Sequence, residues 1–228
     1  ALPIATPLAV VRGAERWLRV YPYYCSEQVA SAALPLAALL RAEGDGLAGV
    51  APPDARRQLE RAVATLQRRQ RADGGIGLWD ARGWTTPWLS AHAGEVLLEA
   101  RAAGVAVSDS VLARLGEYLR GSLRAAQPLY VPVARWLEET RGRLAERVAA
   151  ADYLSRLGQP DLPAENDLLR TAPQMAWEDR IRLAEVLARR GNGGTRAARR
   201  LLESPWSEGR VEGRRGLLPE SGRGDYYI

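Results

Sequence analysis

Apolar residues recur at helical spacing along most of the 228-residue chain, and short turns rich in glycine and proline separate the helical segments. Spacings of three and four residues place apolar side chains on one face of a helix, and the alternation typical of strands is scarce. Short connections favour antiparallel neighbours, stacked as hairpins rather than split between two independent domains. We therefore expect an all-α fold of antiparallel helical hairpins, with residues 1–228 forming one domain.

Prolines, glycines and capping residues set the expected helix boundaries. Pro35 lies inside one helical pattern and is expected to kink that helix or tighten one of its turns. Asp54 and Ser108 each precede a periodic segment and are expected to cap it. Helices are expected over residues 13–20, 25–42, from 54 onward, 87–103, from 108 onward, 128–141, 143–157, 173–190 and 195–202, with Gly142 between two of them, connections at 44–53 and 159–164, and a turn at Asn192-Gly193-Gly194.

The only cysteine, Cys25, lies three residues before Gln28 at the start of one of these helices. Positions i and i+3 share one face of a helix, so the thiol and the carboxamide can meet. The free N–H groups and the dipole at a helix N-terminus also favour a thiolate. A thiolate held against a neutral carboxamide can expel ammonia and leave an internal thioester, a reaction for which a glutamate is poorly suited. The alternative is a buried, inert helix cysteine.

The stretch Tyr21-Pro22-Tyr23-Tyr24-Cys25-Ser26-Glu27-Gln28 resembles the Cys-x-Glu-Gln thioester motif of the alpha-2-macroglobulin and complement family, and its Tyr-Pro-Tyr is similar to the bacterial branch. The resemblance implies that Cys25 and Gln28 form the thioester, flanked by Tyr23, Tyr24 and Glu27. The family pattern has glycine directly before the cysteine, where this sequence has Tyr24. If the bend at this point needs a positive φ, a tyrosine there costs strain that glycine would avoid.

A second segment carries the same resemblance. Residues 70–79 end one helical pattern in an Asp-Gly-Gly turn followed by Trp79, about fifty residues after the cysteine, and the next pattern opens at Pro87 and Trp88. This resembles the helix-turn-helix unit of the thioester domain, whose fold is an α/α toroid that terpene cyclases and prenyltransferases share. Residues 153–158 and 183–191 resemble later hairpins, so the resemblance covers essentially the whole chain. It implies a toroid that is incomplete at the C-terminus.

Charge and composition limit the possible partners. The net charge of +5 and the pI near 9.8 raise nucleic acid as a partner. Yet the arginines are dispersed and have acidic neighbours at helical spacing, which is typical of solvated helix faces, and the basic tail lacks interleaved aromatic residues. We therefore expect no nucleic-acid binding.

The sequence contains no run of eighteen apolar residues, so we expect no membrane span and no membrane contact by this segment. One cysteine excludes an intrachain disulfide. The absence of a leader pattern at Ala1 and the abrupt end at Ile228 are expected for a segment of a much longer protein.

The sequence contains no lysine, so all 32 of its Lys and Arg residues are arginines. One explanation is compositional bias towards arginine and alanine, and this is the explanation that we favour. The other explanation follows from the resemblance, because a thioester domain without lysine cannot be attacked by its own ε-amines.

His92 is the only histidine, and with Cys25 it could form the nucleophile–base pair of a cysteine enzyme. It lies in an apolar helix start where the related bacterial domains carry an aromatic residue, so we favour a structural histidine. Without a general base, a thioester should prefer amines to hydroxyls. Trp79, Trp84 and Trp88 surround the Asp-Gly-Gly turn. These three tryptophans could stack a sugar or an isoprenoid, although filling of the core is favoured. Trp79, Trp88 and His92 are the residues of a possible pocket.

One cysteine, one histidine and no aspartate-rich run predict no metal site and no cofactor, which argues against a terpene cyclase or a zinc prenyltransferase. The resemblance instead implies covalent capture. A protease cleaves a bait region elsewhere in the chain, and one of its lysines then takes the Gln28 acyl group. The protein would be a protease inhibitor rather than an enzyme, placed in the periplasm or cell envelope, with target proteases and other domains of its own chain as partners. Two alternatives stay open: a toroid enzyme that uses Cys25 and His92 on a small substrate, and a helical scaffold that has lost its thioester.

Overall fold

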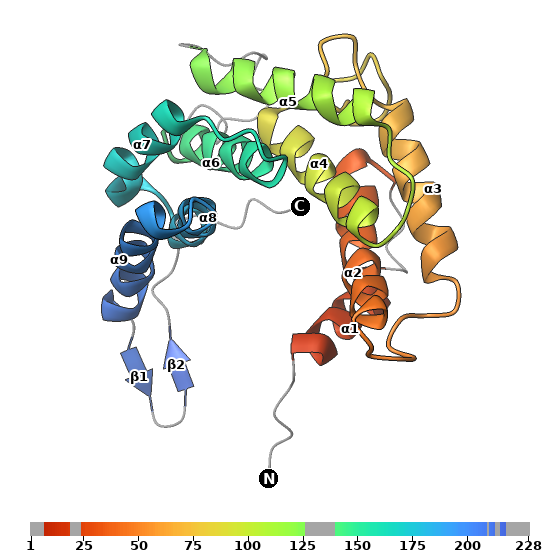
Figure 1. The fold of residues 1–228 in the computed structure, drawn as a ribbon, viewed down its shortest axis with the longest axis horizontal. Helices are drawn as coiled ribbons and strands as arrows, with labels where there is room; N and C mark the ends of the chain where they lie inside the picture. Colours follow the sequence, from red (N-terminus) through yellow and green to blue (C-terminus); the bar gives the residue numbers. More distant parts are fainter. Residues whose placement is uncertain (1–6, 19–23, 126–139, 209, 213–214, 218–228) are drawn as a thin grey trace. The chain divides into compact units, whose positions relative to one another are not determined.

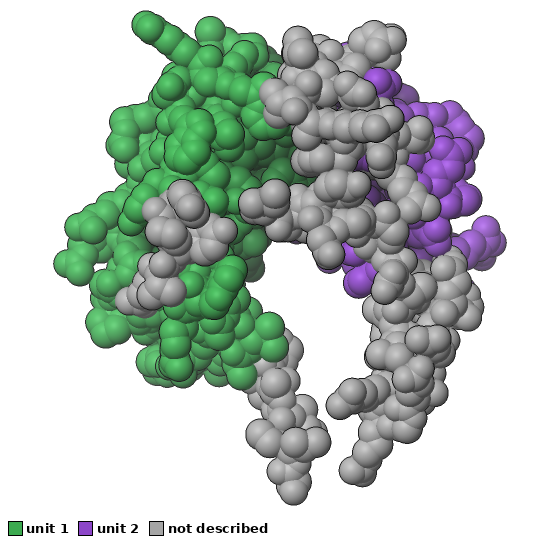
Figure 2. Space-filling model, turned by 180° about the vertical axis from the view of Figure 1, so that it is seen from behind, with its two compact units in different colours: residues 1–118 green, residues 119–228 purple. Residues whose placement is uncertain are grey.

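A computed structural model describes residues 7–18, 24–125, 140–208, 210–212 and 215–217. The contacts divide the chain into two compact units, Ala1–Tyr118 and Leu119–Ile228, which Figure 2 shows in different colours. The division falls within helix α5, Asp109–Arg124. Apart from one isolated bridge and one small hairpin, the regular structure of these described residues is helical, as predicted.

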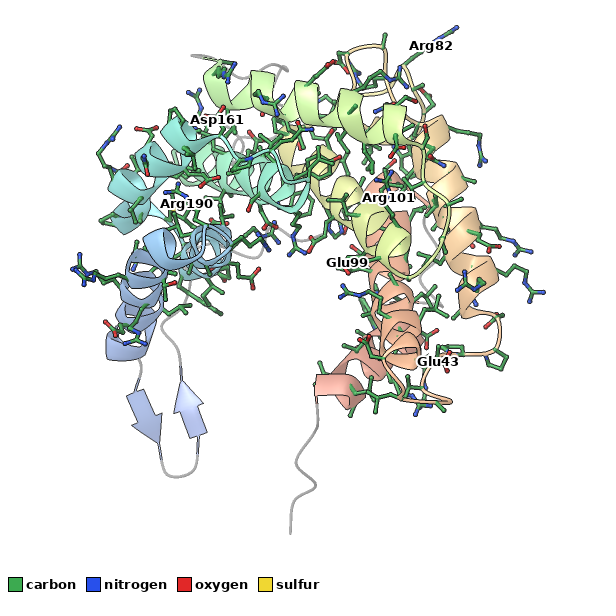
Figure 3. The ribbon with its side chains drawn as sticks, in the orientation of Figure 1. Glu43, Arg82, Glu99, Arg101, Asp161 and Arg190 are labelled. Carbon is green, nitrogen blue, oxygen red and sulfur yellow. The ribbon has the colours of Figure 1, made fainter. Side chains whose placement is uncertain are left out.

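The first unit is built around helix α2. It contains α1 (Pro7–Leu18), α2 (Ser26–Gly44), α3 (Ala55–Arg68), α4 (Pro87–Ala102) and the start of α5. Helix α2 contacts α1, α3 and α4, and α3 also contacts α4, an arrangement that can be followed in Figure 1. An ion pair between Arg41 and Glu99, the latter labelled in Figure 3, joins α2 to α4. The fully buried side chains of this unit include Leu39, Leu59, Leu66, Ile76, Leu97, Leu112 and Leu115.

Local sequence explains where these helices begin. The Oγ1 atom of Thr86 accepts the N–H of Leu89 at 3.0 Å, and Pro87 follows at the first helical position, so the start of α4 lies where it was predicted. Helix α2 continues through Pro35 to Gly44. The cap predicted at Asp54 is wrong in one respect. Asp54 is the N-cap residue of α3 but makes no side-chain cap bond, and its carboxylate instead accepts a bond from the side chain of Gln58 at 2.5 Å.

After the end of α5, the described residues of the second unit form four α-helices, one short 3₁₀ helix and a small hairpin. These are α6 (Thr140–Arg156), α7 (Leu162–Thr171), the 3₁₀ helix η2 (Ala172–Gln174), α8 (Trp177–Ala188) and α9 (Asn192–Glu208), followed by β1 (Arg210–Glu212) and β2 (Arg215–Leu217). Helix α8 contacts α6, α7 and α9, and the two strands pair antiparallel with Val211 opposite Gly216. A buried apolar cluster holds the helices together; it includes Leu144, Val148, Leu168, Met175, Leu183, Val186, Leu187 and Leu201.

Three predictions for this part of the chain are corrected by the structure. Residues 162–164, predicted as part of the connection over 159–164, instead begin α7, because Pro163 lies in the first turn of the helix, where a proline is tolerated, and Asp161 caps it. Gly142 does not separate two helices, since α6 begins at Thr140 and runs through it. The helix predicted over 128–141 falls mostly outside the described residues.

The third correction concerns the glycines near residue 193. Gly193 and Gly194 were predicted to turn, but both lie within the first turn of α9. The turn residue is Gly191, which has a φ of +72°. Gly194 is needed for a different reason. A Cβ atom at Gly194 would lie 1.8 Å from the carbonyl oxygen of Leu187, so only glycine allows α9 to approach the end of α8 this closely.

Candidate functional site

Cys25 is the N-cap residue of α2 and lies in extended backbone, with φ −67° and ψ 164°. Only 7% of its surface is exposed, whereas the preceding Tyr24 is 72% exposed. Among the described residues, positive φ occurs only at glycines. The chain therefore turns into α2 without the strained backbone that would disfavour a tyrosine before the cysteine. Tyr23, the other predicted flanking tyrosine, lies outside the described residues.

The structure brings Gln28 back to Cys25. The two residues form a capping box in which the Oε1 atom of Gln28 accepts the backbone N–H of Cys25 at 3.3 Å, while the Cys25 side chain faces the backbone N–H of Gln28. The first N–H groups of a helix lack partners within the helix, and each of these two side chains faces one of them. The arrangement holds the carboxamide of Gln28 beside the residue that carries the thiol.

Ser26 fixes the start of α2 to the loop that follows α3. Its side chain is completely buried, its N–H donates to the carbonyl of Leu78 at 2.7 Å, and its Oγ atom donates to the carbonyl of Gly77 at 2.6 Å. These two bonds join positions about fifty residues apart in the sequence. The cysteine motif and the Asp-Gly-Gly segment, which were recognised separately in the sequence, therefore meet at one place.

The loop holds its shape through close backbone contacts that only glycine permits. Gly74 has a φ of +94°, and a Cβ atom there would lie 2.3 Å from the carbonyl oxygen of Arg114. A Cβ atom at Gly77 would lie 1.9 Å from the carbonyl oxygen of Asp80. The side chain of Gln70 donates to the carbonyls of Gly74 and Val111, at 3.0 and 2.8 Å, and so ties the turn to α5. The glycines of this segment thus position the carbonyls that receive Ser26.

Arg69 is a residue of this site that sequence reasoning missed. It follows the last residue of α3, and its guanidinium donates to the carbonyl of Tyr24 at 2.8 Å and to the Oγ atom of Ser26 at 3.2 Å. Burial lowers the pKa of Arg69, while the nearby Cys25 and Asp80 act in the opposite direction. Several arginines lie close together in this part of the sequence, and nothing in the pattern distinguishes Arg69 from the others.

His92 is connected to α2 through Ser31. The Oγ atom of Ser31 donates to the Oε1 atom of Glu27 at 2.8 Å and lies 3.0 Å from the Nε2 atom of His92. The single hydroxyl proton goes to Glu27, so Nε2 is the donor towards Ser31. The imidazole also stacks on Trp88, with ring centroids 5.4 Å apart and planes at 22°. The third predicted flanking residue, Glu27, is therefore connected to His92 through Ser31.

The three tryptophans differ in burial. Trp84 and Trp88 are half-buried, but Trp79 is 56% exposed, so the prediction that it fills the core is wrong. Its neighbour Leu78 donates its N–H to the carbonyl of Trp84 at 2.7 Å and directs the loop outward at Trp79.

In the ranges that the structure describes, no three His, Cys, Asp or Glu residues lie close enough to hold a metal ion. No helix among those same residues has both the length and the apolar character needed to cross a bilayer.

Comparisons with known proteins place this chain in a family. No protein-family model matches the sequence. An alpha-2-macroglobulin of Escherichia coli K12 is 30% identical over 185 residues, which is 79% of this chain and 10% of the relative. An alpha-2-macroglobulin homologue of Yersinia pestis is 33% identical over 124 residues, which is 54% of this chain and 6% of the relative. The chain belongs to the bacterial alpha-2-macroglobulin family. It spans about a tenth or less of the length of these two curated relatives.

Solved structures of the family agree on the fold. Trypsin-activated alpha-2-macroglobulin of E. coli is 26% identical and superimposes with a TM-score of 0.67 over 81% of this chain and 13% of the solved chain. A Salmonella alpha-2-macroglobulin reacted with methylamine is 24% identical, with a TM-score of 0.73 over 90% of this chain and 13% of the solved chain. The predicted all-α fold of the α/α toroid class is therefore confirmed for this alpha-2-macroglobulin segment.

Proposed function

We propose that residues 1–228 are the thioester domain of a bacterial alpha-2-macroglobulin that captures proteases covalently. The Sγ atom of Cys25 attacks the Cδ atom of Gln28, the C–N bond of the carboxamide breaks, and ammonia leaves with the thiol proton. A protease lysine later attacks the same carbon as a neutral amine. Its nitrogen forms an amide with the Gln28 acyl group, the C–S bond breaks, and the Cys25 sulfur takes up the proton. Each molecule reacts once, so the protein is an inhibitor and not a catalyst.

The observation that carries this proposal is the reciprocal contact of Cys25 and Gln28 at the start of α2. Gln28 folds back onto Cys25, and Cys25 is buried. Bringing two reacting groups together in a fixed geometry removes much of the entropic part of a reaction barrier. Burial also keeps water away from the acyl group between formation and use. Family membership adds support, since an E. coli relative that resembles this chain is described as trypsin-activated.

The surroundings of His92 support a preference for amines. Acylation of a hydroxyl needs a base that takes the proton, whereas a neutral amine attacks unaided. The Nε2 atom of His92 donates to Ser31 and is engaged there. We therefore propose lysine side chains as the acceptors. The family further suggests the periplasm or cell envelope as the location, and other domains of a longer chain as partners that protect the bond and carry the bait.

Conjugation to a protease tests the proposal. The full-length protein is mixed with trypsin, and covalent adducts that survive denaturing gel electrophoresis are identified by peptide mapping. We expect Gln28 to be linked to a trypsin lysine, no adduct with the variant Cys25→Ala, and no adduct with trypsin whose lysines have been reductively dimethylated. Adducts that persist with Cys25→Ala, or their absence with unmodified trypsin, would contradict covalent capture. The latter result would leave the scaffold alternative.

A further inference from the structure

Arg69 holds the backbone on both sides of the cysteine. Its two hydrogen bonds reach the carbonyl of Tyr24, immediately before Cys25, and the hydroxyl of Ser26, immediately after it. Ser26 is bonded in turn to the loop carbonyl of Gly77. The guanidinium therefore bridges the two neighbours of Cys25 and ties both to the end of α3. A rigid planar fork of donors suits such a two-point contact better than a single ammonium does.

The chemistry of the position also favours arginine over lysine. A guanidinium stays protonated in proteins and does not act as a nucleophile, whereas a lysine becomes a reactive amine once it loses its proton. Burial acts to lower the pKa of Arg69, and the same burial would raise the neutral fraction of a lysine placed there. An amine at this position would be held between the two neighbours of Cys25, the residue that carries the acyl group in a thioester, and so at a high effective concentration.

We propose that Arg69 is the positioning residue of the thioester, and that its side chain must be a guanidinium because a lysine amine at this position would be acylated by Gln28. This inference rests on the proposed function. It explains the absence of lysine at position 69 by the reaction that a lysine there would undergo. This explanation does not depend on why lysine is absent from the rest of the chain. The cation beside the cysteine motif thus binds and orients but does not react.

The variant Arg69→Lys of the full-length protein tests this directly. We expect the lysine nitrogen to attack the Gln28 acyl carbon and release the Cys25 thiol, which leaves an internal amide between positions 28 and 69 and no change in mass relative to the thioester form. Peptide mapping should find this cross-link, with Cys25 open to alkylation before any methylamine is added. Methylamine incorporation at Gln28 should be lost. The rate of cross-linking should rise with pH, about tenfold per unit below the pKa of the lysine, because only the neutral amine attacks.

Two control variants separate reaction from misfolding. Arg68→Lys changes the adjacent arginine, which is exposed and bonds to Thr65 at 3.1 Å, and it should keep wild-type methylamine incorporation without a cross-link. Arg69→Gln removes the guanidinium without adding an amine, and it should lower the fraction of molecules that form the thioester. An Arg69→Lys protein that incorporates methylamine as the wild type does, with no link from 28 to 69, overturns the inference and leaves the proposed function intact. A wild type without methylamine incorporation overturns both.

Discussion

Single residues around Cys25 have separate tasks at this site. Gln28 accepts the N–H of Cys25 at the start of the helix, Ser26 fixes the start of α2 to the loop, and Arg69 bridges the two neighbours of the cysteine. In the proposed function, Gln28 also supplies the acyl carbon. His92 belongs to a hydrogen-bonded chain that ends at Glu27, one residue before Gln28. The approach of Gln28 to Cys25 could be predicted from sequence, because positions three residues apart share one face of a helix. Arg69 could not, because its contacts depend on how the loop after α3 folds back.

We expect His92 to contribute structure rather than chemistry. In His92→Gln the side-chain amide can still donate to Ser31, while the stacking on Trp88 is lost. The rate at which methylamine opens the thioester in the full-length protein should therefore stay within a few-fold of wild type. Stopped-flow or mass-spectrometric measurement of methylamide formation provides the rate. A fall of about a hundredfold, the scale of a general base, would show that His92 takes part in the chemistry.

At the scale of helices, close approach and charge pairing determine how the elements of the second unit fit. Helix α9 begins directly against the end of α8, and α7 carries carboxylates that face arginines of its neighbours. Asp161, at the start of α7, and Arg190, after the end of α8, are labelled in Figure 3. The sequence does not distinguish a glycine that turns the chain from a glycine that permits close packing. The roles of glycines in glycine-rich segments are therefore hard to predict.

Gly194→Ala should destabilise the packing of α8 and α9. The added Cβ atom would lie 1.8 Å from the carbonyl oxygen of Leu187, so backbone must move. A loss of roughly 1–3 kcal/mol in the free energy of unfolding is expected from such overpacking. The matched control is Gly193→Ala, one residue earlier in the same helix, where nothing lies within 4 Å of the new atom. That variant should range from no change to a gain of about 1 kcal/mol. Equal effects of the two variants in urea denaturation would contradict this packing.

Asp167 on α7 should make stability depend on pH. A hydrogen bond from Arg147, at 2.7 Å, is the main cause that lowers the pKa of Asp167, and Arg170 adds to it. The folded-state pKa lies below the unfolded value of about 3.9, so this stabilisation is present above that value and is lost as pH falls through the folded pKa. Asp167→Asn should therefore lower the free energy of unfolding at neutral pH and have no such effect in acid.

The matched control is Asp109→Asn, whose carboxylate is 92% exposed and pairs with Arg101, and which should change stability by no more than about 1 kcal/mol. Glu165, also on α7, gives a profile of opposite slope. Burial raises its pKa despite the ion pair with Arg190, so its contribution to stability is fully present below the ordinary pKa of glutamate and is lost as pH rises through the raised folded-state pKa. Urea denaturation across the acid range distinguishes the two carboxylates. Parallel profiles for Asp167→Asn and Glu165→Gln would contradict these assignments.

For the whole molecule, the class of fold was predictable and its finer divisions were not. Helical periodicity and the proline that opens α4, Pro87, are local signals, and they identified the helices near the site. Pro163 and Gly142 misled the prediction because a proline fits the first turn of α7, and because α6 continues through its glycine. The predicted all-α class holds, with one small β-hairpin beside the helices among the described residues. Contacts between the cysteine motif and the Asp-Gly-Gly loop depend on tertiary structure, which the sequence indicated only through family resemblance.

Peptide mapping of the full-length protein, with and without methylamine, tests the proposed thioester between Cys25 and Gln28 most directly. Before methylamine, Cys25 should resist alkylation and the peptide that holds both residues should be lighter than its sequence by one ammonia. After methylamine, Cys25 should be alkylated and Gln28 should carry a methylamide. Immediate alkylation of Cys25, with Gln28 unmodified after methylamine, would contradict the account.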